Sequence, residues 1–203
     1  MKRLYVLVLG ILFILCGMAT VSAYEDISPQ DAYKMIDPSS STYNPNAYIL
    51  DVRTPAEWKW VGHPGEDKCG NGAFIEGKVI NIPWELWVFD PKTKQYSMEL
   101  NKFFDEEVVR QFSPYDTVII MCRSGIRSLS ASKELEDPTH PSYKRLEELG
   151  YLSIYNMLRG FEGRTDSCGY RTLVEGWKNT GLPYNYNTEG IWIPRQEGRS
   201  LGN

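Results

Sequence analysis

The sequence predicts an α/β domain, because short apolar runs that are typical of buried strands alternate with stretches that are typical of helices. Four runs carry the strand signal, and they cover residues 47–52, 79–83, 117–121 and 153–158. Helix-type stretches lie between them, which is the order expected of parallel βαβ units. With 203 residues, the chain has the length of one domain with additional segments.

The first half of the predicted domain contains two helices whose starts are marked by capping residues. Ser28 is a suitable N-cap and Pro29 a suitable first residue for a helix that ends near Ile36. The dipeptide Thr54-Pro55 predicts a second helix by the same reasoning, after the first strand. Residues 62–77 are rich in Gly and polar side chains and predict a long loop.

The second half contains the strongest strand signal of the chain. An amphipathic pattern predicts a helix over residues 101–112. The β-branched run at 117–121 then predicts a central strand. Further helices are predicted over 125–136, 143–149 and 173–180. Strand and helix signals therefore alternate to the end of the predicted domain.

Residues 1–23 have the parts of a secretory signal peptide. Lys2 and Arg3 are positively charged, residues 4–18 carry no charge, and small residues precede Tyr24. The uncharged run has 15 residues, which is short of the ~20 that a membrane span needs. We therefore expect cleavage before Tyr24 and export to the periplasm, with an uncleaved N-terminal membrane anchor as the alternative.

Removal of the first 23 residues leaves 180, which we divide into a domain over 24–184 and a polar tail over 185–203. This chain has 20 basic and 26 acidic side chains, so its net charge is −6. The excess of acidic side chains argues against nucleic-acid binding, which needs basic residues for the phosphates. No membrane span is expected after processing. Three cysteines remain, Cys69, Cys122 and Cys168. An odd number in an oxidising compartment favours one pair and one free thiol.

The clearest chemical signal follows the strand at 117–121. Cys122 comes directly after this strand, and Arg123, Gly125 and Arg127 follow before a predicted helix begins. The carboxyl end of a parallel strand is where open α/β sheets bind ligands, and a helix N-terminus favours anions. This positive setting should lower the pKa of the Cys122 thiol below its usual value of about 8.5. We expect a nucleophilic thiolate that meets an anionic substrate, with a buried structural cysteine as the alternative.

Short motifs spread from Leu50 to Pro183 together carry a family resemblance. The motifs are Leu50-Asp51-Val52-Arg53, Glu57-Trp58, Gly62-His63-Pro64, Asn81-Ile82-Pro83, Cys122-Arg123-Ser124-Gly125-Ile126-Arg127-Ser128, Arg159-Gly160-Phe161-Glu162-Gly163, Gly176-Trp177 and Gly181-Leu182-Pro183. With them the chain resembles a single-domain rhodanese, a sulfurtransferase. The resemblance implies a rhodanese-like fold, in which a mostly parallel five-stranded sheet has helices on both faces.

The resemblance also implies a persulfide mechanism at Cys122. The thiolate attacks the outer sulfur of an anionic donor such as thiosulfate, sulfite leaves, and a thiol, cyanide or a partner protein's cysteine accepts the sulfur. The loop that binds the donor is formed by Arg123, Ser124, Gly125, Ile126, Arg127 and Ser128. No cofactor and no metal are expected; His63 beside Cys69 lacks the second ligand pair of a zinc site.

Two alternative functions stay open. The first is a sulfur carrier or interaction module that accepts a persulfide from a partner and turns over small molecules poorly. The second is a cysteine phosphatase, which uses a Cys-x5-Arg loop sized for a phosphoryl group. Arg127 lies five positions after Cys122, which gives Cys-x4-Arg and favours sulfur transfer.

The remaining polar candidates have structural interpretations. Asp51, Arg53 and Glu57 are expected to form an ion-pair and hydrogen-bond set near the end of the sheet, with acid–base catalysis as the alternative. Cys69 and Cys168 lie in segments that depart from the family pattern, and we expect them to form a disulfide. A resolving role for Cys69 against the persulfide is the alternative.

Three aromatic residues between the second and third predicted strands have two interpretations. Trp84, Trp87 and Phe89 either line a pocket or pack a surface, and packing is favoured.

Overall fold

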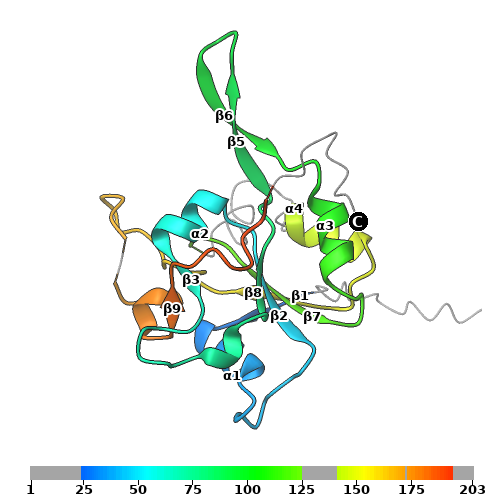
Figure 1. Cartoon of the computed structure of the whole chain (residues 1–203), viewed down its shortest axis with the longest axis vertical. Helices are drawn as coiled ribbons and strands as arrows, with labels where there is room; N and C mark the ends of the chain where they lie inside the picture. Colours follow the sequence, from blue (N-terminus) through cyan, green and yellow to red (C-terminus); the bar gives the residue numbers. More distant parts are fainter. Residues whose placement is uncertain (1–23, 125–140, 172, 194–203) are drawn as a thin grey trace, which may run out of the picture.

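The computed structural model describes residues 24–124, 141–171 and 173–193. A five-stranded sheet forms the centre of the molecule, with strand order β1-β8-β7-β2-β4 (Figure 1). All neighbouring pairs in this sheet are parallel. Its strands are β1 (Tyr24–Ile27), β2 (Ala47–Asp51), β4 (Val79–Asn81), β7 (Thr117–Met121) and β8 (Ser153–Met157). The predicted α/β class and the five-stranded sheet are confirmed, and β1 is a strand that the sequence pattern did not predict.

Helices cover both faces of the sheet. The α-helices are α1 (Pro29–Ile36), α2 (Pro55–Val61), α3 (Phe104–Gln111) and α4 (Pro141–Glu148). Ile36 of α1 and Trp58 of α2 belong to one buried cluster, whereas Val108 of α3 and Leu146 of α4 belong to another. The strongest strand, β7, is buried at all of its residues, so both clusters pack against it.

The two helix starts predicted from capping residues are confirmed. The Ser28 hydroxyl accepts the backbone N–H of Asp31 at 3.1 Å and so caps α1. At α2, the Thr54 hydroxyl accepts the Glu57 N–H at 3.2 Å, and the Glu57 carboxylate accepts the Thr54 N–H at 3.0 Å. This reciprocal capping box satisfies two donors that the first turn of a helix leaves free.

The helix predicted over 173–180 is wrong. In its place the chain forms an irregular turn that ends in the short 3₁₀ helix η3 (Lys178–Thr180). Gly176 has a φ of +84°, outside the helical region, and a Cβ at this position would lie 2.3 Å from the backbone nitrogen of Gly163. Close approach of two backbone segments therefore excludes the helix here. The helix predicted over 125–136 lies outside the described residues.

An antiparallel hairpin, formed by β5 (Glu85–Asp90) and β6 (Gln95–Leu100), extends from the body of the domain (Figure 1). The sequence pattern did not predict these two strands. Residues 91–94 form its turn, in which Lys94 has a φ of 58° and donates its N–H to the Asp90 carbonyl at 2.9 Å.

Part of the predicted tail packs against the domain. The two-residue strands β3 (His63–Pro64) and β9 (Tyr184–Asn185) pair with each other. Beyond β9, the Gly190 carbonyl accepts the Asn81 N–H at 3.1 Å, beside the edge strand β4. Trp192 is 7% exposed and joins the buried cluster on the α3 and α4 side. None of the helices in the described part of the chain is long and apolar enough to cross a lipid bilayer.

Candidate active site

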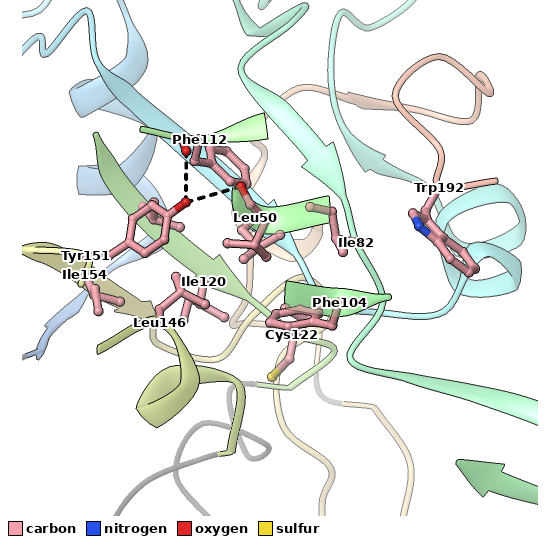
Figure 2. Packing of buried hydrophobic residues seen from close by; sticks show 13 residues of the cluster. Leu50, Ile82, Phe104, Phe112, Ile120, Cys122, Leu146, Tyr151, Ile154 and Trp192 are labelled. Atoms are coloured by element: carbon pink, nitrogen blue, oxygen red, sulfur yellow. Dashed lines mark hydrogen bonds between the residues drawn. The ribbon is translucent and has the colours of Figure 1, made fainter. Parts of the chain in front are cut away.

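Cys122 lies directly beyond the carboxyl end of the central strand β7, as predicted. Its side chain is 2% exposed and belongs to the cluster that contains Phe104 and Ile120. Side chains alternate between the two faces of a strand, so Val118, Ile120 and Cys122 face α3 and α4. Figure 2 shows Cys122 at the margin of this cluster, beside the Phe104 ring.

Two backbone hydrogen bonds fix the start of the loop that follows β7. The carbonyl of Cys122 accepts the Phe161 N–H at 2.9 Å, and the carbonyl of Arg123 accepts the Glu162 N–H at 2.8 Å. The chain reaches this position after β8 through a turn in which Arg159 has a φ of 65° and Gly160 a φ of 51°. The turn thus places two consecutive amides, those of Phe161 and Glu162, against the backbone of Cys122 and Arg123.

The side chain of Arg123 is held by carboxylates from two other segments. Its Nε lies 3.0 Å from Glu162 Oε1 and 4.0 Å from Glu57 Oε1, and the side chain is 43% exposed. The second oxygen of Glu162 lies 3.6 Å from Arg171 Nε. The positive charge that the sequence places beside Cys122 is therefore accompanied by two negative charges, which weakens the field that Arg123 directs at the thiol.

A buried ion pair between Asp51 and Arg53 lies near this end of the sheet. Asp51 and Arg53 are both fully buried, and the two Arg53 nitrogens that face the carboxylate lie 2.6 to 3.1 Å from its oxygens. Burial alone would lower the pKa of Arg53, but the Asp51 carboxylate raises it above its ordinary value, so the guanidinium stays charged.

The ion pair also connects to Cys122. The guanidinium carbon of Arg53 lies 4.3 Å from the centre of the Phe161 ring, and Phe161 donates its N–H to the Cys122 carbonyl. Asn81, the last residue of the neighbouring strand β4, donates from its amide to the carbonyls of Asp51 and Arg53 at 2.9 and 2.7 Å. Asp51 and Arg53 thus form an ion pair near the end of the sheet, and Glu57 lies 4.0 Å from Arg123, while their structural role stays a prediction.

The structure places only the first part of the predicted donor-binding loop. Ser124 is buried at 8% exposure. Gly125, Ile126, Arg127 and Ser128 lie outside the described residues. The anion-binding role predicted for them, and for Arg127 above all, stays a prediction.

The disulfide expected between Cys69 and Cys168 is absent. Among the described cysteines, Cys69 and Cys168 are exposed free thiols and Cys122 is a buried one. Each exposed cysteine lies in a turn closed by its own aspartate. Asp67 Oδ1 accepts the Cys69 N–H at 2.8 Å, and Asp166 Oδ1 accepts the Cys168 N–H at 2.9 Å. Both turns are satisfied locally, so neither needs a bridge to the other.

The sequence motifs contained Phe161 and Glu162, whose backbone amides bond the carbonyls of Cys122 and Arg123 and which we call the backbone braces. The motifs did not reveal this function. Phe161 and Glu162 belong to the Arg159–Gly163 motif, but nothing in the local pattern relates this motif to Cys122. The only available signal was that apolar Phe161 and acidic Glu162 follow a predicted buried strand. The two contacts of Arg123 with carboxylates join segments distant in sequence, which periodicity cannot detect.

One large cleft of the described residues is not lined by Cys122. It has a volume of about 1210 Å³ and is lined by residues of α2, β3, β4 and β9, among them Trp58, His63 and Tyr184. His63 is stacked on Trp58 with ring centres 3.7 Å apart, and its nitrogens face the carbonyls of Pro64 and Asn187. Burial lowers the pKa of His63. No cluster of three metal-ligating side chains occurs within the described residues.

The match to a family model accounts for this architecture. The model described as "Rhodanese-like domain" matches residues 28–166, which is more than half of the chain. The protein therefore belongs to the rhodanese-like domain family, as its motifs suggested.

Relatives with similar sequences have diverse descriptions. Uncharacterized protein RP600 of Rickettsia prowazekii is 30% identical over 164 residues, which cover 80% of this chain and 98% of that protein. Thiosulfate sulfurtransferase 18 of Arabidopsis thaliana is 31% identical over 117 residues, or 55% of this chain and 79% of that one.

A solved structure, the crystal structure of Rv0390 from M. tuberculosis, has a similar fold. Its TM-score is 0.55 at 28% identity, and the match covers 80% of this chain and 97% of that one.

Proposed function

We propose that the protein is a sulfurtransferase that moves a sulfane sulfur from an anionic donor, such as thiosulfate, to a thiophilic acceptor through a persulfide on Cys122. The observation that carries the proposal is the position of Cys122, a free thiol beyond the central strand whose loop is anchored by two backbone hydrogen bonds. The family and the relative named as a thiosulfate sulfurtransferase support the same reaction.

The first half-reaction loads the enzyme. The Cys122 thiolate attacks the outer sulfur of thiosulfate and forms a new S–S bond. The S–S bond of thiosulfate breaks, and its electron pair leaves with sulfite. Because sulfite is a stable anion, no general acid is needed to protonate the leaving group.

The second half-reaction returns the enzyme to its starting state. A nucleophile such as cyanide or a thiolate attacks the outer sulfur of the Cys122 persulfide. The bond between the two sulfurs breaks, the electron pair returns to Cys122 as thiolate, and the product is thiocyanate or a new persulfide. A firmly held cysteine suits this exchange, because the same sulfur must act in turn as nucleophile and leaving group.

The backbone braces have a defined part in this proposal. The amides of Phe161 and Glu162 bond the carbonyls of Cys122 and Arg123, so these two residues keep their positions while sulfur is added and removed. Arg123 contributes a positive charge beside Cys122, which Glu162 and Glu57 partly offset. Asp51 and Arg53 act through Phe161 and are positioning residues.

The test is thiosulfate:cyanide turnover combined with intact-mass analysis. Wild type should turn over and gain one sulfur after exposure to thiosulfate. Cys122→Ser should lose both properties, whereas the matched control Cys168→Ser should keep both, because Cys168 lies in an exposed turn.

Other outcomes would identify the alternatives. Sulfur loading of Cys122 without turnover would favour a sulfur carrier. Neither loading nor turnover, together with hydrolysis of an aryl phosphate, would favour a cysteine phosphatase.

We also propose that the protein is exported with cleavage before Tyr24. The support is the charge and hydropathy pattern of residues 1–23, which lie outside the described residues. N-terminal sequencing of the protein recovered from the periplasm should begin at Tyr24. A full-length chain retained in the membrane fraction would show the anchored alternative.

A further inference from the structure

The β5–β6 hairpin has one apolar face. In its antiparallel ladder, directly opposed residues share a face, and successive pairs alternate between the two faces. One face therefore carries the pairs Glu85–Leu100, Trp87–Met98 and Phe89–Tyr96, which together we call the apolar hairpin face. Trp87 is 61% exposed, Tyr96 67% and Leu100 64%.

The other face of the hairpin has both apolar and polar side chains and is partly covered. It carries the pairs Leu86–Glu99, Val88–Ser97 and Asp90–Gln95. Leu86 packs against the buried cluster that contains Cys122 and Phe104. The apolar hairpin face is therefore on the side away from that cluster, on an arm that projects from the domain (Figure 1).

This arrangement is unfavourable for an isolated molecule. A two-stranded ribbon alone is marginally stable in water, and large contiguous apolar patches usually mark interaction sites. The rings of Phe89 and Tyr96 contact each other across the strands, with centroids 5.1 Å apart, which supports the outer end of the hairpin. Trp87 and Leu100 gain no comparable cover.

The charges of the hairpin differ between its two ends. Glu85 and Glu99 lie at the base, whereas Lys92 and Lys94 lie in the turn at the tip. The Asp90 carboxylate folds into the turn, where it accepts the Lys92 N–H at 2.8 Å and the Thr93 hydroxyl at 2.9 Å. The base is thus acidic, and the tip has an excess of positive charge.

We propose that the apolar hairpin face binds the same face of a second copy of this chain, in an antiparallel two-fold arrangement. With Trp87 of each copy at the axis, the basic tip of one hairpin lies beside the acidic base of the other. A parallel arrangement would bring like charges together. A self-complementary patch of this kind forms an isologous interface, which closes as a dimer.

The same features disfavour a lipid surface as the occupant. A hairpin that enters a membrane needs an apolar tip, and this tip consists of Pro91, Lys92, Thr93 and Lys94. The apolar side chains lie along the length of the arm, where a second hairpin of equal length can cover them. The proposal does not depend on the sulfurtransferase reaction.

Sedimentation of the purified protein over a range of concentrations tests the proposal. Wild type should form a dimer. Trp87→Glu should raise the dissociation constant of the dimer by roughly 30-fold or more for each substituted copy. A central Trp is a typical hot spot, and its replacement by Glu buries a charge. The matched control Val88→Glu, one residue away on the opposite face, should leave the dimer intact.

A charge-reversal pair tests the antiparallel arrangement. Lys94→Glu should weaken the dimer, and the added change Glu85→Lys should restore it. The far-ultraviolet circular dichroism of each variant shows that it is folded. Thiosulfate turnover, measured in parallel, should be the same in Trp87→Glu and wild type.

Three results would overturn the proposal. The first is a wild-type protein that is monomeric at all concentrations. This holds also if Trp87→Glu abolishes sulfur transfer to a protein acceptor, which would indicate a different partner for the hairpin. The second is a dimer that Trp87→Glu leaves unchanged. The third is a monomer that binds phosphatidylglycerol vesicles through Trp87.

Discussion

Cys122 and the β5–β6 hairpin leave the same end of the sheet, because β4 and β7 are both parallel to β2 and the hairpin begins soon after β4. At Cys122 nearly every group is enclosed: the thiol is 2% exposed and both adjacent carbonyls are bonded. In the hairpin, Trp87 and Tyr96 are more than half exposed.

The difference fits two separate tasks at one end of the sheet. The proposed sulfur transfer at Cys122 requires a backbone that keeps its position. The proposed contact with a second copy requires exposed side chains. Variants that weaken each region separately will show how far the two tasks are independent.

The largest effect is expected from Arg53→Met. Removal of one partner from a buried ion pair leaves the other charge uncompensated, which typically costs about 3–5 kcal/mol. Asp51 is fully buried, so the free energy of unfolding in urea should fall by about that amount. The matched control is Lys34→Met, which removes an exposed ion pair with Asp31 and should cost at most about 1 kcal/mol. Equal losses in the two variants would show that the buried pair does not support the sheet end.

Acid should destabilise the protein through His63. Burial lowers the pKa of His63 in the folded protein, so folding favours the neutral ring. This contribution is fully present above the unfolded pKa of about 6.5 and is lost as the pH falls through the folded value. The slope for a single proton is at most about 1.4 kcal/mol per pH unit.

The measurement is the free energy of unfolding of wild type and His63→Gln between neutral pH and the acid side of 6.5. The curve of the variant should be flatter, since Gln does not titrate. Parallel curves for wild type and His63→Gln would contradict the assignment. Asp51 and Arg53 are the charged groups that act on His63, and they oppose each other.

A smaller effect is expected when the charge around Arg123 changes. Glu162→Gln removes one of the two carboxylates beside the guanidinium but keeps the backbone N–H that bonds the Arg123 carbonyl. The field near Cys122 becomes more positive, so KM for thiosulfate should fall by up to about 5-fold while kcat changes little. The change should shrink in high salt. A rise in KM would show that Glu162 orients Arg123 toward the donor.

The sequence was sufficient for four strands of the sheet and for the position of Cys122. These four strands lie in short, mostly apolar runs, and the position of Cys122 after β7 follows from one of them. β1 was missed because its four residues, Tyr-Glu-Asp-Ile, have no apolar run and pair only at the sheet edge. The predicted helix at 173–180 failed at Gly176, where a tertiary contact determines the backbone.

The contacts that hold Cys122 and Arg123 in place could not be predicted, because they join residues that are distant in the sequence. Glu162 reaches Arg123 across 39 positions of the sequence. The hairpin had a local signal that was available: β5 contains the apolar run Leu86–Phe89, and polar and apolar residues alternate in β6, beyond the turn at Pro91–Lys94. Both strands are largely exposed, so the apolar run of β5 does not mark a buried strand of the central sheet.

The smallest effect is expected in the hairpin, and a matched pair of Phe→Ala variants measures it. Phe161 is fully buried over Arg53, so Phe161→Ala should cost about 3–5 kcal/mol of unfolding free energy. Phe89 is 44% exposed and contacts Tyr96 across the ladder, so Phe89→Ala should cost less than about 1 kcal/mol. Both variants are measured at concentrations low enough to keep the chain monomeric, since dimerisation adds stability of its own. A comparable loss in the two variants would mean that the hairpin is part of the cooperative core, and the contrast between a braced site and a separate arm would then be wrong.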